Sequence, residues 1–176
     1  MSTKHLIVPQ AVRQTIIGVE SHPITYLVEK GAILRFIRAI NDDGPRFYGD
    51  GEPGNSFPDN MAAPPTFLCS LFSGLRELEW ENPFEGLLDG NVEWEFLGPV
   101  HAGDNITVTS TIIDIAEKDG RLGSMLLVTT EFNYVNQSNT LVAVQRNTLI
   151  WYDPQIAHQS SHARPDEGSS SVKDQE

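Results

Sequence analysis

The spacing of apolar residues changes several times along the chain, and each change marks a predicted element. Apolar positions at helical spacing predict a short helix over residues 8–17, which Gly18 ends. Alternating apolar and polar positions predict a strand over residues 22–29. Apolar residues then recur at i, i+3, i+4 and i+7, which predicts a largely buried helix over residues 30–41.

The second half of the chain is dominated by predicted strands. Two prolines open a second apolar helix at about residues 65–75, because the first helical turn does not need their missing N–H groups. Residues 79–88 read as irregular, and strands are predicted at 92–96, 106–115, 124–135 and 141–152. Short turns between these strands predict antiparallel pairing. The fold class is therefore α+β, with the helix at 30–41 covering the apolar face of the sheet.

The length of 176 residues fits one domain. We place this domain at residues 1–155, followed by a tail at 156–176 that is too polar to pack and is expected to be disordered. Residues 48–61 form a long loop rich in glycine and proline, of the kind that often serves binding. One folded unit therefore has to carry the function.

Charge and cysteine content exclude several function classes. A net charge of −12 argues against nucleic-acid partners and anionic membrane surfaces, which require a basic face. No apolar stretch is long enough to span a membrane, and the N-terminus lacks a secretory signal, so a cytoplasmic protein is expected. Cys69 is the single cysteine, which excludes an intrachain disulfide and a thiolate metal cluster. Its apolar surroundings predict a buried, unreactive thiol.

Several segments resemble, in order and spacing, the MaoC-like dehydratase and hydratase family. The likeness is closest to the N-terminal-half type, which includes the small subunits of heterodimeric 3-hydroxyacyl-thioester dehydratases. It covers roughly residues 12–152. The matching segments are Tyr-Leu-Val-Glu-Lys at 26–30, Ala-Ile-Asn-Asp-Asp-Gly-Pro at 39–45, Ala-Pro-Pro-Thr-Phe at 63–67, Glu-Trp-Glu-Phe at 93–96, Gly-Pro-Val at 98–100, Ala-Gly-Asp at 102–104 and Thr-Val at 107–108. The resemblance implies a hot-dog fold, in which a curved antiparallel sheet wraps around a long central helix.

The resemblance also implies a reaction. Family members interconvert 2-enoyl and 3-hydroxyacyl thioesters by adding or removing water, and their substrates are carried on CoA or on an acyl-carrier protein. No cofactor and no metal are implied. The implied partners are this thioester and a second hot-dog subunit, which forms a homodimer or a heterodimer with the chain.

The expected catalytic motif is incomplete. Hydration of a conjugated thioester needs a base for water and an acid for the alpha carbon. The family pattern resembles Asp-x-Asn-Pro-x-His, and in this chain Asp42 and Pro45 fill their places while Phe47 stands where the histidine is expected. Phenylalanine cannot transfer a proton. Asp42 is therefore a candidate catalytic residue, and its alternative role is that of a turn former.

Three interpretations of this departure remain open. The chain is a degenerate subunit that binds the acyl chain and pairs with an active partner, or it is an active enzyme with another second group. Tyr48 and His101 are the candidates for that group, and Asp43 is a nearby carboxylate; His101 is alternatively an exposed turn residue. The third interpretation is a non-catalytic thioester-binding or scaffolding protein. A thioesterase of the same fold is less favoured.

The start of the second helix is the candidate substrate-binding segment. Backbone N–H groups at a helix start can stabilise an enolate oxygen, and after two prolines those of Thr66 and Phe67 are the available donors. The alternative is an ordinary helix start with a local role for the Thr66 hydroxyl. The candidate substrate-binding residues are Pro45, Phe47, Pro65, Thr66 and Phe67.

Overall fold

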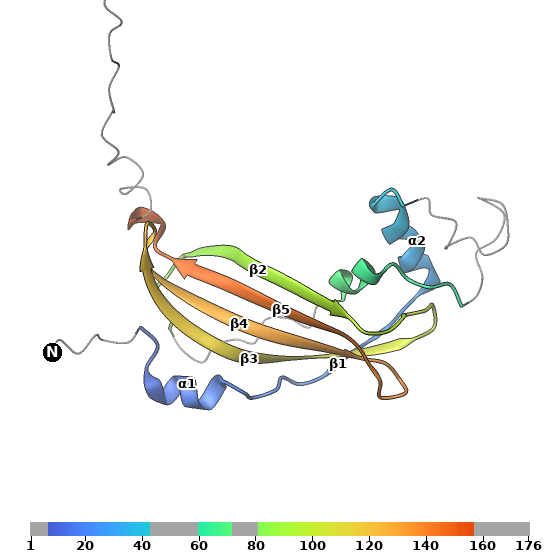
Figure 1. Cartoon of the computed structure of the whole chain (residues 1–176), viewed down its shortest axis with the longest axis horizontal. Coiled ribbons are helices and arrows are strands. Elements are labelled where there is room, and N and C mark those ends of the chain that lie inside the picture. The colour runs from blue at the N-terminus through green and yellow to red at the C-terminus, as the bar shows by residue number, and fades with distance from the viewer. Residues whose placement is uncertain (1–6, 43–59, 72–80, 157–176) are drawn as a thin grey trace, which may run out of the picture.

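The protein is built around one antiparallel sheet, as the sequence predicts (Figure 1). The structure is a computed structural model and describes residues 7–42, 60–71 and 81–156. Within them the strands follow the spatial order β1-β3-β4-β5-β2. Their bounds are β1 (Ile24–Leu27), β2 (Gly86–Phe96), β3 (Asn105–Gly120), β4 (Gly123–Val135) and β5 (Leu141–Tyr152). The helices are α1 (Gln10–Ile16), α2 (Lys30–Ala39) and the 3-10 helix η2 (Pro65–Ser70).

Three predicted boundaries differ from the observed ones: β3 continues to Gly120, five residues beyond its predicted end, and the other two concern β2 and η2. β2 begins at Gly86, so residues 86–88, which were expected to be irregular, belong to a strand paired with β5. The pairing shifts register between Asp89 and Asn91, and a Cβ on Gly90 would lie 2.8 Å from the side chain of Ile150. The bulge interrupts the alternation by which a strand is recognised in a sequence, while cross-strand packing keeps the strand in place. The second predicted helix is the six-residue η2 at its start.

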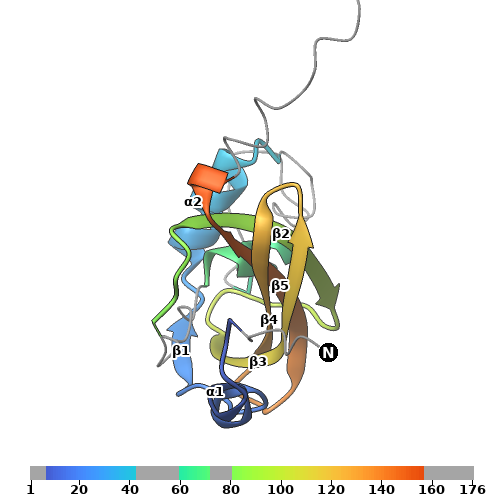
Figure 2. The ribbon, with the colours of Figure 1, turned by 90° about the vertical axis from the view of Figure 1, so that its left-hand side faces the viewer.

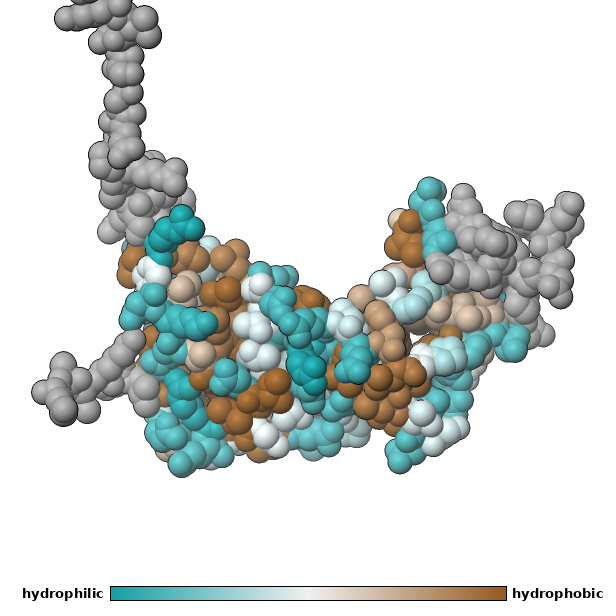
Figure 3. All heavy atoms as spheres, in the orientation of Figure 1, coloured by the Kyte–Doolittle hydropathy of each residue, from teal (hydrophilic) through white to brown (hydrophobic). Residues whose placement is uncertain are grey.

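The expected long central helix is not present in the described residues. α2 has ten residues and is about 15 Å long, whereas the sixteen residues of β3 extend about 50 Å. α2 lies at one end of the sheet and α1 at the opposite end (Figure 1). In the view along the long axis, α2 is at the upper left and α1 at the bottom (Figure 2). Ile33 and Ile37 are buried, but Ile40 is 45% exposed, so one narrow face of α2 packs. The molecule is hollowed between α2 and the other end of the sheet (Figure 3).

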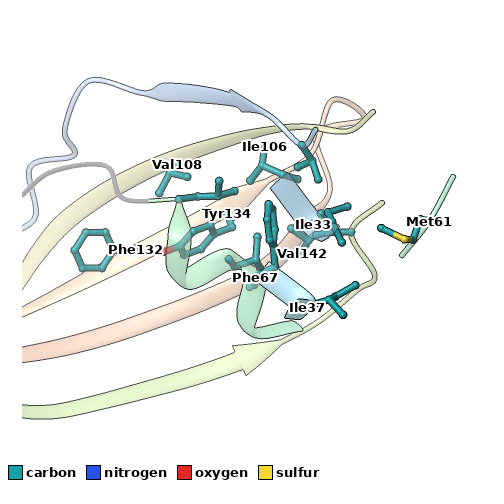
Figure 4. Close-up of a cluster of buried hydrophobic side chains, with 14 residues drawn as sticks. Ile33, Ile37, Met61, Phe67, Ile106, Val108, Phe132, Tyr134 and Val142 are labelled. Carbon is teal, nitrogen blue, oxygen red and sulfur yellow. The ribbon is translucent and has the colours of Figure 1, made fainter. Parts of the chain in front are cut away.

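Buried side chains gather in two clusters on the same face of the sheet. The buried residues of β4 alternate, and Phe132 and Tyr134 join the cluster at the α2 end, while Leu126 and Val128 join the cluster at the α1 end. In the first cluster, side chains from α2, η2 and the strands meet (Figure 4). Its buried members are Val28, Ile33, Ile37, Met61, Phe67, Leu68, Leu71, Val100, Ile106, Val108, Phe132, Tyr134, Val142 and Ala143.

Candidate functional site

The turn between β2 and β3 is fastened to the segments that flank it in space. Gly103 N–H donates to the Val28 carbonyl at 2.8 Å, and Val28 N–H donates to the Asp104 carbonyl at 2.8 Å. Ala63 N–H donates to the Val100 carbonyl, also at 2.8 Å. Gly103 has φ 92°, a conformation that glycine adopts without strain. The turn is thus hydrogen-bonded to the residue that precedes α2 and to the segment that leads into η2.

His101 lies in this turn, and its nearest acidic partner is Asp104. The backbone N–H of His101 donates to Asp104 Oδ2 at 2.7 Å, and His101 Nδ1 lies 4.0 Å from the same oxygen. The His101 side chain is 40% exposed, whereas that of Asp104 is 17% exposed. The carboxylate of Asp104 therefore closes the turn, and sequence reasoning did not single it out. The signal was present in the short His-Ala-Gly-Asp turn.

η2 brings the predicted substrate-binding residues beside α2. The Phe67 ring packs edge-on against Phe36, with ring centroids 5.6 Å apart and an interplanar angle of 83°. Phe67 is buried, while Pro65 and Thr66 are exposed. The N–H of Phe67 donates to the Pro64 carbonyl at 2.8 Å. That donor is engaged within the first turn of η2, so in this conformation it is not available to a substrate oxygen.

Asp42 follows a helix end with a specific hydrogen-bond pattern. Asn41 adopts φ 54°, and its N–H donates to the Arg38 carbonyl at 3.2 Å. The N–H of Asp42 donates to the Ile37 carbonyl at 3.1 Å. These two bonds form a Schellman motif, which satisfies carbonyl groups at the end of α2 and directs the chain away from the helix. The backbone of Asp42 therefore has the turn-forming role. Asp42 is half-buried, and its side chain stays a candidate catalytic group.

The candidate residues do not converge on one point. His101 lies in the turn bonded to Val28, just before α2 begins, whereas Asp42 lies just after α2 ends. The ten-residue α2, about 15 Å long, lies between these two positions along the chain. η2, through Phe67, contacts the second half of α2 and lies closer to the Asp42 end. Pro45, Phe47 and Tyr48, as well as Asp43, lie outside the described residues, as does the predicted tail from residue 157 onward.

Comparison with known proteins decides the family. The model of the "FAS1-like, dehydratase domain region" family matches residues 15–145, most of the chain. The chain belongs to this dehydratase-domain family. A UPF0336 protein of Streptomyces coelicolor is 35% identical over 119 residues, which are 62% of this chain and 77% of that protein.

Two solved structures place the dehydratase domain among hot-dog proteins. The HadBC (3R-hydroxyacyl-ACP dehydratase) complex of Mycobacterium tuberculosis aligns with a TM-score of 0.58 and 24% identity, over 77% of this chain and 96% of that one. A MaoC-like dehydratase of Rhodospirillum rubrum aligns with a TM-score of 0.57 and 22% identity, over 78% and 92%. The resemblance to MaoC-like dehydratases and the hot-dog fold class are confirmed.

The dehydratase domain also holds a buried tyrosine that the sequence did not single out. Tyr134 is 2% exposed, and its hydroxyl donates to Gln145 Oε1 at 2.9 Å. Burial raises the pKa of Tyr134 above its ordinary value, and the neighbouring Cys69 and Tyr26 raise it further.

Cys69 is exposed, contrary to the prediction of a buried thiol. Nearby protein atoms still desolvate it enough to raise its pKa, so the thiol stays protonated.

The opposite face of the domain carries a separate polar groove of about 590 Å³. Thr107, Thr109 and Asn133 contribute to it, and none of Asp42, His101 or Thr66 does. No group of three or more metal-ligating side chains occurs within residues 7–42, 60–71 and 81–156. In the same residues, no helix has the length and apolar character needed to cross a bilayer.

Proposed function

We propose that this chain is the acyl-thioester-binding subunit of a hydratase/dehydratase that interconverts 2-enoyl and 3-hydroxyacyl thioesters. Membership of the dehydratase-domain family supports the reaction type. The contact of Phe67 in η2 with Phe36 in the second half of α2 supports a binding site toward the Asp42 end of this helix, because Pro65 and Thr66 of η2 are exposed. The thioester is carried on CoA or an acyl-carrier protein, and we expect the reaction to take place in the cytoplasm.

The chemistry needs two proton-transfer groups within reach of one water molecule. A base removes a proton from water as its oxygen adds to the beta carbon, and an acid then protonates the alpha carbon of the resulting enolate. Asp42 is the candidate for one group. Pro65, Thr66 and Phe67 are the candidates for holding the acyl thioester, with Pro45 and Phe47, which follow Asp42 in the sequence.

The observation that carries the proposal is the placement of the two candidates: the turn of His101 is hydrogen-bonded to Val28 before α2 begins, and Asp42 follows the end of α2. A general base has to lie within hydrogen-bond reach of the proton that it removes, directly or through one water. The helix between these two positions is about 15 Å long, which is more than two groups bridged by one water molecule can span. Phe47 stands in the histidine position, and within the described residues His101 is the other candidate acid–base group beside Asp42. This favours a partner that supplies the complete pair over activity of the chain alone.

β2 is the candidate surface for that partner. It is one of the two edge strands of the sheet in the described residues, the other being β1, and Leu88, Val92 and Phe96 expose 43%, 47% and 41% of their surface. An exposed apolar edge strand is a template for pairing with another strand. Glu93 and Glu95 are also exposed on β2, and a second copy would bring like charges together. We therefore propose a heterodimer with a hot-dog subunit whose edge is less acidic.

Activity in the presence and absence of such a partner tests the proposal. The full chain is assayed with crotonyl-CoA and with a longer 2-enoyl-CoA, alone and mixed with a hot-dog subunit that carries an intact Asp and His pair. We expect little turnover alone, activity in the mixture, and a shift of both proteins to a common peak in size-exclusion chromatography. Turnover by the isolated chain equal to that of the mixture would contradict the subunit role.

Two variants separate binding from structure. Asp42→Asn is expected to raise the KM of the mixture or lower its rate, whereas Asp114→Asn makes the same chemical change at an exposed position of β3 and is expected to leave both unchanged. Release of free CoA from a saturated acyl-CoA would instead indicate a thioesterase. Folded protein that neither hydrates enoyl-CoA in the mixture nor binds it would overturn the proposal.

A further inference from the structure

Polar side chains separate the two buried clusters on the same face of the sheet. Thr130 of β4 lies between Val128 and Phe132, points to the same buried face, and is 7% exposed. Its cross-strand partner on β5 is Asn147, and the next position on that face of β5 is Gln145. Small domains normally have one contiguous core. We name the residues that interrupt it here, Thr130, Gln145 and Asn147, the polar strip.

One atom of the polar strip has no hydrogen-bond partner among the residues that the structure describes. Asn147 Oδ1 is buried and accepts no hydrogen bond, whereas Gln145 Oε1 accepts the Tyr134 hydroxyl at 2.9 Å. A buried carbonyl oxygen without a donor costs about 1–3 kcal/mol. The oxygen can only accept, so its missing partner has to be a hydroxyl or an N–H group. A hydrocarbon chain supplies neither.

The polar strip lies beside the edge strand β2, on which apolar side chains are exposed. Val92 on β2 is the other cross-strand partner of Asn147 and is 47% exposed. Farther along β2, Trp94 stacks on Phe96 with ring centroids 5.5 Å apart, and Trp94 also packs against Tyr134 at 5.3 Å. A ligand that reaches Asn147 from the α2 end therefore crosses aromatic surface before it meets the acceptor. Amphipathic chains with one internal polar group fit this sequence of surfaces.

Asn147 lies far from η2 and Asp42, where we propose that the thioester binds. The polar group of the ligand would therefore be far from its thioester. Asn147 is four residues along β5 from Ala143, which belongs to the cluster at the α2 end. Four strand residues span about 13 Å. A thioester held near η2 and Asp42 would bring a distant part of its acyl chain to the polar strip.

We infer that the acyl group bound by this chain carries a hydroxyl group partway along or at the end of its chain, and that Asn147 Oδ1 accepts the hydrogen bond from that hydroxyl. The inference rests on the proposed function, because it takes an acyl thioester as the ligand. It adds a substrate class, oxygenated acyl thioesters, to the reaction type. Amide N–H groups of the pantetheine arm have the same donor chemistry, and the experiment has to distinguish them.

Calorimetric titration with paired ligands tests the inference. The full chain, alone and with its hot-dog partner, is titrated with decanoyl-CoA and ω-hydroxydecanoyl-CoA, and with the corresponding dodecanoyl pair. We expect the hydroxylated member of at least one pair to bind about tenfold more tightly, which corresponds to one buried hydrogen bond. Asn147→Leu is expected to abolish this preference.

Matched variants control for folding and position. Asn133→Leu makes the same change on the opposite face of the neighbouring strand β4 and is expected to keep the preference. Thr130→Val is a smaller change within the polar strip. Thermal unfolding verifies that each of these variants is folded. Preservation of the preference in folded Asn147→Leu would overturn the inference.

The remaining outcomes separate this inference from the proposed function. Equal affinity of the wild type for both members of every pair would overturn the inference alone and leave thioester binding intact. A loss of affinity for decanoyl-pantetheine in Asn147→Leu, without any effect of the ω-hydroxyl, would overturn it in favour of the pantetheine amides. Failure of the wild type to bind any of these thioesters would overturn the proposed function and the inference with it.

Discussion

Arg13 Nη2 lies 2.5 Å from Glu117 Oε1, and this contact fastens α1 to the far end of β3. The two side chains are 14% and 7% exposed, so the pair is largely shielded from water. Arg13 also donates to the carbonyl oxygens of Ile115 and Val8, and Val8 N–H donates to Glu117 Oε1 at 3.1 Å. The N-terminal segment is therefore attached to the sheet through one carboxylate.

Replacing this carboxylate should destabilise the fold. Glu117→Gln removes the charge that faces Arg13 and leaves the guanidinium shielded without its counter-ion. Because breaking a buried pair from one side strands the other charge, we expect the free energy of unfolding to fall by about 2–4 kcal/mol. Urea titration measures it. Glu85→Gln, at an exposed position, should change stability by less than about 0.5 kcal/mol, and an equal loss in both variants would contradict the assignment.

The same carboxylate should make stability depend on pH in the acidic range. Burial by itself would raise the pKa of Glu117, but hydrogen bonds from the Val8 and Ile7 N–H groups and from Arg13 outweigh burial and hold this pKa below its ordinary value. A depressed pKa in the folded state contributes stability above the unfolded pKa of about 4.3. That contribution is lost as the pH falls through the folded pKa.

Stability curves of the wild type and Glu117→Gln measure the difference between pH 7 and the acidic limit. We expect the two curves to approach one another as the pH falls below about 4. A gap that stays constant down to the acidic limit would show that the titration of Glu117 is not linked to folding.

The left-handed conformation of Asn41 sets the exit of the chain from α2. Asn41→Gly should keep the Schellman motif, because glycine adopts positive φ without strain. Asn41→Val should cost about 1–2 kcal/mol and displace Asp42. Unfolding measurements give the loss of stability, and enoyl-CoA affinity reports the displacement of Asp42. If Asn41→Val binds like Asn41→Gly, the helix end does not position the binding site.

The Tyr134 hydroxyl should stabilise the protein through Gln145. Tyr134→Phe removes the donor and leaves a buried amide oxygen without a partner, so we expect a loss of about 1 kcal/mol. Because the pKa of Tyr134 is raised in the folded state, folding should also weaken as the pH rises above the unfolded value of about 10. Tyr134→Phe should lack this alkaline component, and Tyr152→Phe should retain it; ultraviolet titration combined with unfolding curves measures both.

Much of the fold was predictable because it depends on local periodicity. The alternation that predicted a strand at residues 124–135 comes from side chains pointing to opposite sides, and β4 covers almost the same residues. The helical spacing at residues 30–41 likewise anticipated α2. The start of β2 could not be predicted in this way, because its bulge at Gly90 is maintained by contact with Ile150, sixty residues away along the chain.

The candidate site, like the fold, was predictable from the sequence only where it depends on local patterns. The sequence by itself determined the family resemblance, the type of each element and the chemistry of Asp42 and His101, because these follow from residue types and short spacings. Only the tertiary structure decided that those two residues lie at opposite ends of α2, and that Asn147 shares a buried face with Thr130 and Val92. Such relationships arise from hydrogen bonds and packing between distant segments, which no local pattern encodes.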